Sequence, residues 1–206
     1  MTSPVFKFSQ LAELDITIII VSFNTREILL RCLESIKKHT QGISYEVIVV
    51  DNASEDGTVN AVVELFPEVE VISNKDNRGF SAANNQGIIV SKGKKIALLN
   101  PDTLLTENSF KKIKDFLEKH PDFSILGAGI VDKNNQPCPV RLWEDRPQDA
   151  ALKILGKYNP ENELKKMGPK LTREAKVISG CCFVITRDLV ESIGVMDENY
   201  FLYNEE

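Results

Sequence analysis

Between residues 15 and 130 the chain repeats a regular pattern, in which short β-branched runs alternate with longer segments of helical period. The run Ile16–Phe23 is mostly apolar and β-branched, which predicts a buried strand of a parallel sheet. Four more strands are predicted at residues 45–50, 69–73, 95–99 and 123–130. The segments between them carry apolar side chains every three or four residues, which predicts helices packed on the sheet.

Sequence signals mark the ends of the predicted helices. Asn24, with Glu27 three residues later, predicts an N-cap and a capping box for the first helix. Pro67 predicts the end of the second helix, and Thr106 predicts the cap of the fourth. The third helix is predicted at residues 79–92 and is unusually polar. The residues predicted to face the core from the other three helices are Ile28, Leu29, Cys32, Leu33 and Ile36; Val59, Val62, Val63 and Phe66; and Phe110, Ile113, Phe116 and Leu117.

Strands that alternate with helices through short connections predict an α/β fold, with a Rossmann-like, mostly parallel sheet and helices on both faces. Residues 15–130 carry this pattern, after a leader expected at residues 1–14. Residues 131–206 are expected to form a second half of different character. Its predicted parts are an irregular, proline-rich segment at 137–175, a strand at 177–185 and a short helix at 186–193.

Composition and charge narrow the class of protein. The 206 residues include 25 Lys and Arg against 30 Asp and Glu, and 42% are apolar, which is typical of a globular protein. The net charge of −5 argues against nucleic acid as a partner, because nonspecific binding to phosphate needs a basic face. The longest apolar run, near Ile16–Val21, is far shorter than the ~20 residues of a membrane helix.

The N-terminus and the cysteines predict a cytoplasmic protein. Residues 1–14 lack the basic region and apolar core of a signal peptide. The four cysteines do not have the paired spacing of a zinc site, and we expect reduced thiols. They are Cys32, Cys138, Cys181 and Cys182.

Polar residues follow four successive predicted strands, and ligands of open parallel sheets bind at the carboxyl ends of strands. The segments are Ser22-Phe23-Asn24, Asp51-Asn52-Ala53-Ser54, Asn74–Phe80 and Asn100-Pro101-Asp102. The chain has neither a Gly-x-Gly-x-x-Gly motif after the first strand nor a P-loop. A bound phosphate would therefore need a divalent cation held by a carboxylate.

Each of these segments admits a functional and a structural interpretation. Asp102 is placed to hold a cation that two phosphate oxygens already bridge, but Asn-Pro-Asp-Thr is also common in turns. Asp51 could accept the imide N–H of a uracil or thymine ring, or it could cap an Asx-type turn. Gly79 permits close approach of the backbone to a ligand, and Arg78 could reach a phosphate or a base.

Taken together, these segments resemble glycosyltransferase family 2, the inverting transferases of the GT-A fold, and are most similar to its rhamnosyltransferase-like branch. The motifs that carry the resemblance lie in order over nearly all of residues 15–206. They are Val21-Ser-Phe-Asn24, Val49-Val-Asp-Asn-Ala-Ser-Glu-Asp-Gly-Thr58, Asn77-Arg-Gly-Phe80 with Asn84-Asn85, Leu98-Leu-Asn-Pro-Asp102 and Phe201-Leu-Tyr-Asn-Glu-Glu206.

The resemblance implies a nucleotide-sugar-binding half at residues 15–130 and an acceptor-side half at 131–206. The donor would be a UDP or dTDP sugar, with Asp51 at the base and Asp102 holding Mg²⁺ or Mn²⁺. Asp102 matches the last aspartate of the Asp-x-Asp metal motif, in which Asn100 here replaces the first. The other residues implied to contact substrate are Ser22, Asn24, Asn52, Arg78, Gly79, Asn84, Asn100, Ser179 and Gly180.

The resemblance also implies the reaction and its setting. Glu205 and Glu206 match the Glu-Asp pair that supplies the catalytic base, with Glu206 in place of the aspartate. The acceptor would be a glycan or a lipid-linked sugar of cell-surface polysaccharide, reached by peripheral contact with the inner face of the membrane. The family continues past the position of Glu206, so the second half is expected to be truncated.

Two other functions compete with this interpretation. A nucleotide-sugar-binding domain without catalysis stays open, because Asn100 and Glu206 both depart from the family's pattern. A sugar-phosphate nucleotidyltransferase needs a glycine-rich, basic loop after the first strand, and residues 22–27 contain no glycine.

Overall fold

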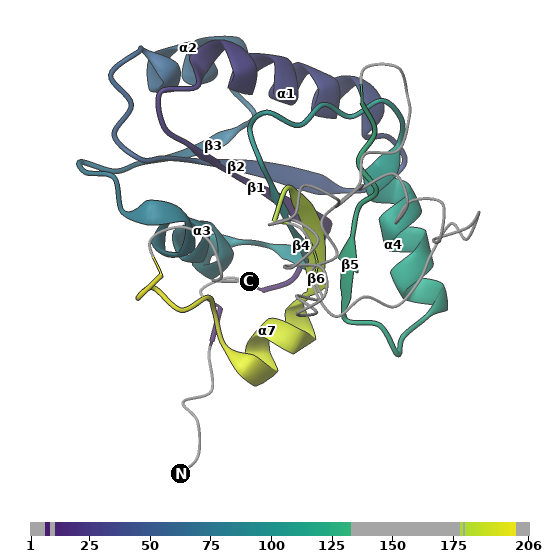
Figure 1. Ribbon diagram of the computed structural model, residues 1–206. Helices are drawn as coiled ribbons and strands as arrows, with labels where there is room; N and C mark the ends of the chain where they lie inside the picture. The colour runs from purple at the N-terminus through teal and green to yellow at the C-terminus, as the bar shows by residue number, and fades with distance from the viewer. Residues whose placement is uncertain (1–6, 9–10, 133–177, 179, 201–206) are drawn as a thin grey trace, which may run out of the picture. The chain divides into compact units, whose positions relative to one another are not determined.

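A computed structural model describes residues 7–8, 11–132, 178 and 180–200. The chain divides into two compact units, residues 1–128 with 180–206, and residues 129–179. The first unit holds a six-stranded sheet with the strand order β3-β2-β1-β4-β6-β5 (Figure 1). Of the second unit, the structure describes residues 129–132 and 178.

Four strands run parallel and form the part of the sheet that the sequence predicts most closely. They are β1 (Leu14–Ser22), β2 (Tyr45–Asp51), β3 (Glu70–Ser73) and β4 (Gly93–Leu99). In register, Ser22 pairs with Asp51, and Asp51 pairs with Ser73. The carboxyl ends of these strands therefore meet at one edge, and the predicted α/β architecture is confirmed.

The far side of the sheet is mixed. β6 (Cys182–Thr186) lies between β4 and β5 (Ile125–Gly127) and is antiparallel to both. Both strands are shorter than their apolar segments predict, and the antiparallel direction of β6 does not follow from the sequence pattern. A buried strand shows the same apolar run in either direction, so strand order and direction are set by tertiary pairing.

Helices cover both faces of the sheet (Figure 1). Buried residues of α1 (Arg26–His39), α2 (Thr58–Leu65) and α4 (Ser109–Lys119) join one core cluster. Figure 1 shows α3 (Gly79–Val90) and α7 (Arg187–Ile193) on the opposite side from α1 and α2. The sheet is thus the central layer of this unit.

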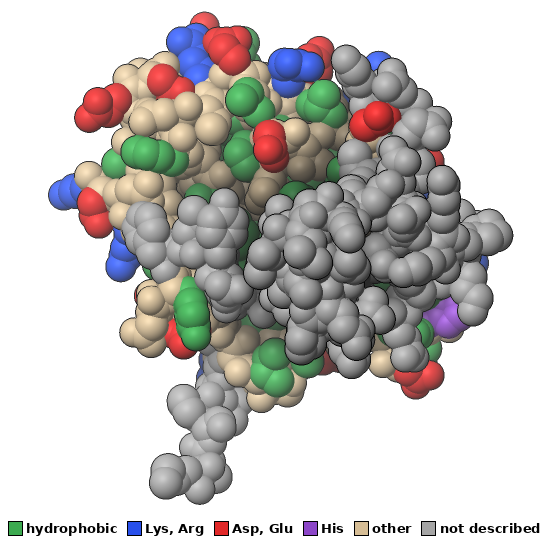
Figure 2. Space-filling view, viewed as in Figure 1, with side chains coloured by type: hydrophobic (Ala, Val, Ile, Leu, Met, Phe, Trp, Pro, Cys, Tyr) green, Lys and Arg blue, Asp and Glu red, His purple; other side chains and the backbone are tan. Residues whose placement is uncertain are grey.

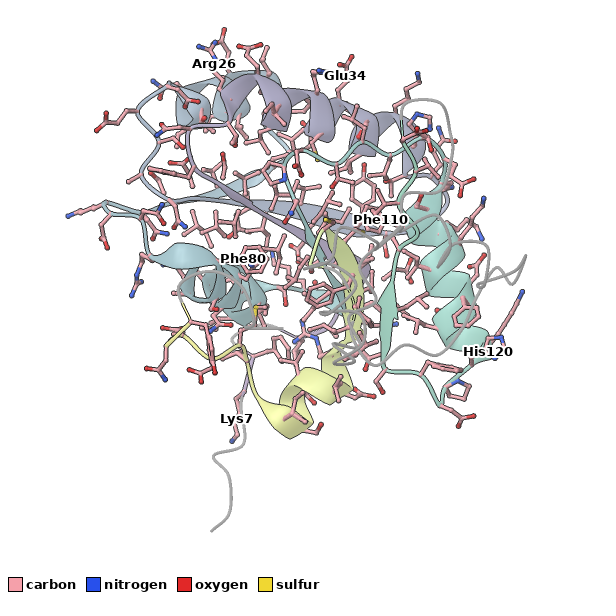
Figure 3. The ribbon with its side chains drawn as sticks, viewed as in Figure 1. Lys7, Arg26, Glu34, Phe80, Phe110 and His120 are labelled. Carbon is pink, nitrogen blue, oxygen red and sulfur yellow. The ribbon has the colours of Figure 1, made fainter. Side chains whose placement is uncertain are left out.

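Alternation along β1 builds the core on both faces. Ile16, Ile18 and Ile20 belong to the cluster that holds α1 and α4, and Ile19 faces Gly87 of α3. Each of these isoleucines is fully buried, and such burial stabilises the fold by about 1.5–3 kcal/mol per side chain. Figure 3 shows Phe110 of α4 directed toward the interior.

Two helix caps differ from the predicted ones. Thr25, not Asn24, is the N-cap of α1, because Asn24 adopts a left-handed backbone and its Oδ1 accepts the Glu55 N–H at 2.8 Å. The capping-box prediction is therefore wrong: a loop thirty residues away uses the side chain instead. The N-cap of α4 is Asn108, and Thr106 lies exposed before it.

Two residues predicted to face the core are exposed. Val63 of α2 is 56% exposed and Ile28 of α1 is 46% exposed, whereas their neighbours Val62 and Leu29 are fully buried. Adjacent helical residues lie about 100° apart, so a narrow buried stripe admits one of each pair.

Charged side chains do not gather by sign on the surface that Figure 2 shows. Blue Lys and Arg and red Asp and Glu side chains are interspersed around its upper rim. Among the described helices, none combines the length and the apolar character that crossing a bilayer requires.

Candidate functional site

The carboxyl edge of the parallel strands brings together the polar ends of β1, β2 and β4. Ser22 and Asp51 end two neighbouring strands in the same register, and Asp102 follows β4 by three residues. Only β1 lies between β2 and β4 in the sheet. Two strand spacings separate these strands by about 10 Å, the scale of a small polar ligand lying across the edge.

Asp51 is the most unusual side chain of this edge. It is fully buried, and its Oδ2 accepts the backbone N–H of Ser54 at 2.9 Å. Its Oδ1 is buried as well, yet no described residue donates a hydrogen bond to it. A buried carboxylate oxygen without a donor is costly, so this atom is suited to an N–H that a ligand brings. Oδ2 thus makes the turn that one interpretation of Asp51 predicted, and Oδ1 is left for the base that the other interpretation predicted.

The loops after β1 and β2 hold each other through several hydrogen bonds. Asn24 donates its backbone N–H to Ser54 Oγ at 2.8 Å, in addition to accepting from Glu55. Arg26 donates its backbone N–H to Asp56 Oδ2 at 2.9 Å. These contacts assign Asn24, predicted to contact substrate, a role in loop structure.

Ser22 is buried, and its hydroxyl lies 2.9 Å from that of Thr25. Ser22 is the last residue of β1, directly before the first of these loops.

Asp56 is partly desolvated, which raises its pKa, but hydrogen bonds from Thr58 and Arg26 outweigh this and hold the pKa below its ordinary value. The carboxylate of Asp56 therefore stays ionised and anchors the two loops.

The start of α3 shows why glycine follows Arg78. Gly79 has a φ of 80°, in the left-handed region that a side chain would strain. Its backbone N–H donates to Asn77 Oδ1 at 3.0 Å, which fixes this turn. Arg78 precedes the helix with its side chain exposed, so its guanidinium is accessible to a ligand at this edge.

Asn52 was predicted to contact substrate, but the protein itself occupies both groups of its amide. Its Nδ2 donates to the carbonyl of Gly79 at 3.1 Å, and its Oδ1 accepts from Asn74 Nδ2 at 2.9 Å. Asn74 in turn exchanges two hydrogen bonds of 2.9 Å with the amide of Gln86 on α3. Asn52 is 2% exposed and lies inside this network rather than on the surface of a pocket.

The adjacent asparagines of α3 face different partners. Asn84 is buried, and its Nδ2 donates to the carbonyl of Phe80 in the same helix at 3.0 Å. Asn85 pairs with the backbone of Met196: it accepts the N–H at 3.0 Å and donates to the carbonyl at 2.9 Å. Ser81 adds a hydrogen bond of 3.0 Å to the carbonyl of Tyr200. α3 therefore holds the segment that leads to residues 201–206.

The segment after β4 is a turn, as one of its interpretations predicted. The N–H of Asn100 donates to the carbonyl of Cys181 at 2.9 Å, and its carbonyl accepts from Thr103 at 3.1 Å. Asp102 is exposed within this turn. Burial first, then the neighbouring Cys182 and the charge of Asp102, raise the pKa of Cys32 to about 12.

The donor set at Asp102 fits a cation that a ligand helps to hold. Nowhere in the described ranges do three or more His, Cys, Asp or Glu side chains gather as a metal cluster. Asp102 offers one exposed carboxylate at the strand edge. A Mg²⁺ or Mn²⁺ ion there would take its further oxygen ligands from a diphosphate and from water.

The structure describes only part of the remaining predicted site residues. Ser179, Glu205 and Glu206 fall outside the described residues. Gly180 is half-buried in the turn before β6.

The sequence predicted no role for Gln86 or Ser81, and it placed Asn74 and Asn85 in motifs without assigning a contact to either. The polar character of α3 was the available signal, because buried amides on a helix need partners.

Comparison with known proteins adds independent findings. A sequence model described as Glycosyl transferase family 2 matches residues 17–194. The chain is 26% identical over 179 residues to N-acetylglucosaminyl-diphospho-decaprenol L-rhamnosyltransferase of Mycobacterium tuberculosis (strain ATCC 25618 / H37Rv), covering 78% of this chain and 58% of that protein. It is 31% identical over 156 residues to the uncharacterized glycosyltransferase YwdF of Bacillus subtilis (strain 168), covering 72% and 57%. The chain thus spans somewhat more than half the length of these relatives.

Solved structures share the fold at lower identity. The mannosyltransferase PcManGT from Pyrobaculum calidifontis, in complex with GDP-Man and Mn²⁺, has a TM-score of 0.63 at 20% identity, covering 90% of this chain and 48% of that one. TarS 1-349 of S. aureus, in complex with UDP, has a TM-score of 0.67 at 16% identity, covering 93% and 52%. Both likenesses show the GT-A glycosyltransferase fold.

Proposed function

Because this chain belongs to glycosyl transferase family 2, we propose that it binds a nucleoside-diphosphate sugar at the carboxyl edge of its sheet and transfers the sugar to an acceptor hydroxyl. The family predicted from the sequence is confirmed. The activity of the whole protein is our proposal, since the chain spans 58% of its rhamnosyltransferase relative. We also propose a rhamnosyltransferase-like specificity, which that relative supports at 26% identity.

The observation that carries the proposal is the free Oδ1 of Asp51. This atom is buried at the strand edge and lacks a donor among the described residues. The imide N–H of uracil or thymine is a donor of the required kind, and a base placed there would satisfy the carboxylate. The other oxygen stays on Ser54, so the carboxylate is fixed before the ligand arrives.

The diphosphate would lie along the same edge toward β4. Asp102 would hold a Mg²⁺ or Mn²⁺ ion, which when bound neutralises charge on the departing diphosphate. Arg78 and Gly79 would flank the nucleotide, with the exposed guanidinium available to a phosphate or the base. The TarS complex with UDP and the PcManGT complex with GDP-Man and Mn²⁺ support a nucleotide ligand of this fold.

The transfer step would use residues at the end of the chain. Glu206, or Glu205 beside it, would take the proton of the acceptor hydroxyl as its oxygen attacks the anomeric carbon. The bond from that carbon to the diphosphate breaks on the opposite face, so the configuration inverts through a cation-like sugar. The resemblance to the family's Glu-Asp pair assigns this role to the two carboxylates.

The names of two relatives support a proposal for the acceptor. The rhamnosyltransferase relative is named for a sugar, N-acetylglucosamine, that a diphosphate links to decaprenol. A second relative, 29% identical over 185 residues, is the minor teichoic acid biosynthesis protein GgaB of Bacillus subtilis (strain 168). We therefore infer a glycan or lipid-linked acceptor in cell-surface synthesis. The resemblance of the motifs implies that this acceptor is reached at the cytoplasmic face by peripheral contact with the membrane.

The test is calorimetric titration with UDP and dTDP, in Mn²⁺ and in EDTA, comparing the native chain with Asp51→Asn. In the variant the amide oxygen would keep the Ser54 N–H, so the NH₂ group would face the ligand donor and repel it. We expect binding in Mn²⁺ and a loss of about tenfold or more in Asp51→Asn, the size of a hydrogen bond to a charged group. Asn60→Asp, an exposed exchange on α2, serves as the control. Absence of binding by the native chain would refute the proposal.

A second variant tests the cation site separately. Asp102→Ala removes the one carboxylate of the turn after β4, so the difference in affinity between Mn²⁺ and EDTA should shrink toward nothing. Asp122→Ala, an exposed aspartate before β5, is the matched control. An unchanged metal dependence in Asp102→Ala would remove this residue from the site.

A further inference from the structure

We propose that the amide network of Asn52, Asn74 and Gln86 is a positioning element that sets which nucleobase the donor site accepts. The inference rests on the proposed function and deepens it, because the network contacts the two segments that flank the proposed site, the strand end at Asp51 and the start of α3. Of its three residues, the sequence predicted a substrate contact only for Asn52. In the structure, its amide is occupied by the protein.

The network joins three segments that are far apart in sequence. Asn52 follows β2 directly after Asp51, Asn74 follows β3, and Gln86 lies in the second turn of α3. The Asn74 and Gln86 amides form a reciprocal pair with two hydrogen bonds of 2.9 Å. The second hydrogen of Asn74 Nδ2 goes to Asn52 Oδ1, also at 2.9 Å. The three amides thus act as one connected unit.

The network holds α3 at two points. Asn52 Nδ2 bonds the carbonyl of Gly79 at the first residue of the helix, and Asn74 bonds Gln86 seven residues later. At 1.5 Å per residue these points lie about 10 Å apart along the helix axis. Two contacts at that distance constrain both the position and the tilt of the helix.

The same unit is tied to the strand that carries Asp51. The backbone N–H of Asn74 donates to the carbonyl of Asp51, and that of Asn52 donates to the carbonyl of Ser22, both at 2.8 Å. The network therefore fixes the distance between the free Oδ1 of Asp51 and the start of α3, where Arg78 and Gly79 lie. A fixed distance favours one size of base, since a base of another size would have to move one wall.

The geometry makes Gln86 the residue to test, because its amide bonds Asn74 and it is not one of the residues proposed to contact the nucleotide. Gln86→Met keeps the length of the side chain but removes both hydrogen bonds to Asn74. Gln41→Met makes the same exchange at an exposed position after α1 and is the matched control. Asn74→Asp, which loses both donated bonds of the amide, is the second variant should Gln86→Met fold poorly.

The experiment measures dissociation constants for UDP, dTDP, GDP and ADP in Mn²⁺ by calorimetry, together with the thermal midpoint of each protein. We expect the preferred nucleotide to lose about tenfold or more in Gln86→Met, while the ratio between the preferred and disfavoured bases falls toward one. The control should keep both the affinity and the ratio.

Three results would overturn the inference in distinguishable ways. Unchanged affinity and selectivity in both Gln86→Met and Asn74→Asp would show that the network does not determine which base the site accepts. An equal loss for every nucleotide, in step with a lower thermal midpoint, would show support of the fold alone. If the native chain binds none of the four nucleotides, the proposed function fails together with the inference that rests on it.

Discussion

Among single residues, burial decides which ionisable groups can take part in chemistry. Asp51 is buried with one oxygen anchored and one free, whereas Asp102 is exposed. Cys32 and Cys182 are also buried, but desolvation raises the pKa of each thiol to about 12. A thiol with that pKa is a small core residue rather than a nucleophile.

The two buried thiols should therefore resist alkylation in the native protein. At pH 8 a pKa of about 12 leaves roughly one thiolate in ten thousand. We expect iodoacetamide to modify Cys32 and Cys182 only after denaturation, as peptide mass spectrometry would report. Rapid modification of either residue in the folded state would contradict their burial.

The same shift predicts a loss of stability in alkali. The folded pKa of these thiols lies above the ordinary value of 9.0, so their contribution is complete below that pH and is lost as the pH rises toward 12. Urea unfolding between pH 8 and pH 11 should show this decline. The double variant Cys32→Ala, Cys182→Ala should show a shallower decline, although its stability at pH 8 will be lower.

Among secondary-structure elements, α3 and β4 pack so closely on β1 that two of their positions admit only glycine. A Cβ added to Gly87 would lie 2.7 Å from Cγ2 of the fully buried Ile19. A Cβ at Gly93 would lie 2.2 Å from the backbone nitrogen of Thr17, which cannot move without breaking the sheet. Both glycines are therefore required by space rather than by backbone angle.

This packing predicts a ranking of alanine variants. Gly87→Ala should destabilise the protein by about 1–3 kcal/mol, because overpacking outweighs the gain of about 1 kcal/mol in helix propensity. Gly93→Ala should cost more or prevent folding. Gly129→Ala is the control, since a Cβ there meets nothing within 4 Å. Urea unfolding measures all three, and a Gly87→Ala protein as stable as the native one would contradict the packing.

The contact of α3 with residues 196–200 is a second property of this element. Asn85→Asp would keep the oxygen that accepts from Met196, but it would lose the donors to the Met196 carbonyl and to Glu198. A new carboxylate would then face an acidic side chain. We expect faster hydrogen exchange in a peptide covering residues 196–200, with α1 unaffected. Asn60→Asp is the exposed control, and equal exchange in both variants would disprove the tether.

In the whole molecule, one side of the sheet could be predicted from the sequence and the other side could not. The parallel strands and their polar ends were predictable, because β-branched runs and strand-end residues carry local signals. The direction of β6 was not, since its pattern is the same either way. The side chain of Asn24 accepts the Glu55 N–H instead of capping α1, and the side chain of Asn52 accepts from Asn74 instead of being free for substrate. Tertiary contacts set both partners, so neither could be predicted from the local sequence. The free oxygen of Asp51 is likewise visible only in three dimensions.

The central claim for the whole molecule is that the free oxygen of Asp51 and the carboxylate of Asp102 serve one bound nucleotide. A crystal structure with UDP and Mn²⁺, phased to show the anomalous signal of manganese, tests this most directly. The account predicts the base N–H within about 3 Å of Asp51 Oδ1, and a manganese peak joining Asp102 to the diphosphate. A nucleotide bound away from Asp51, or a manganese peak with no contact to Asp102, would contradict it.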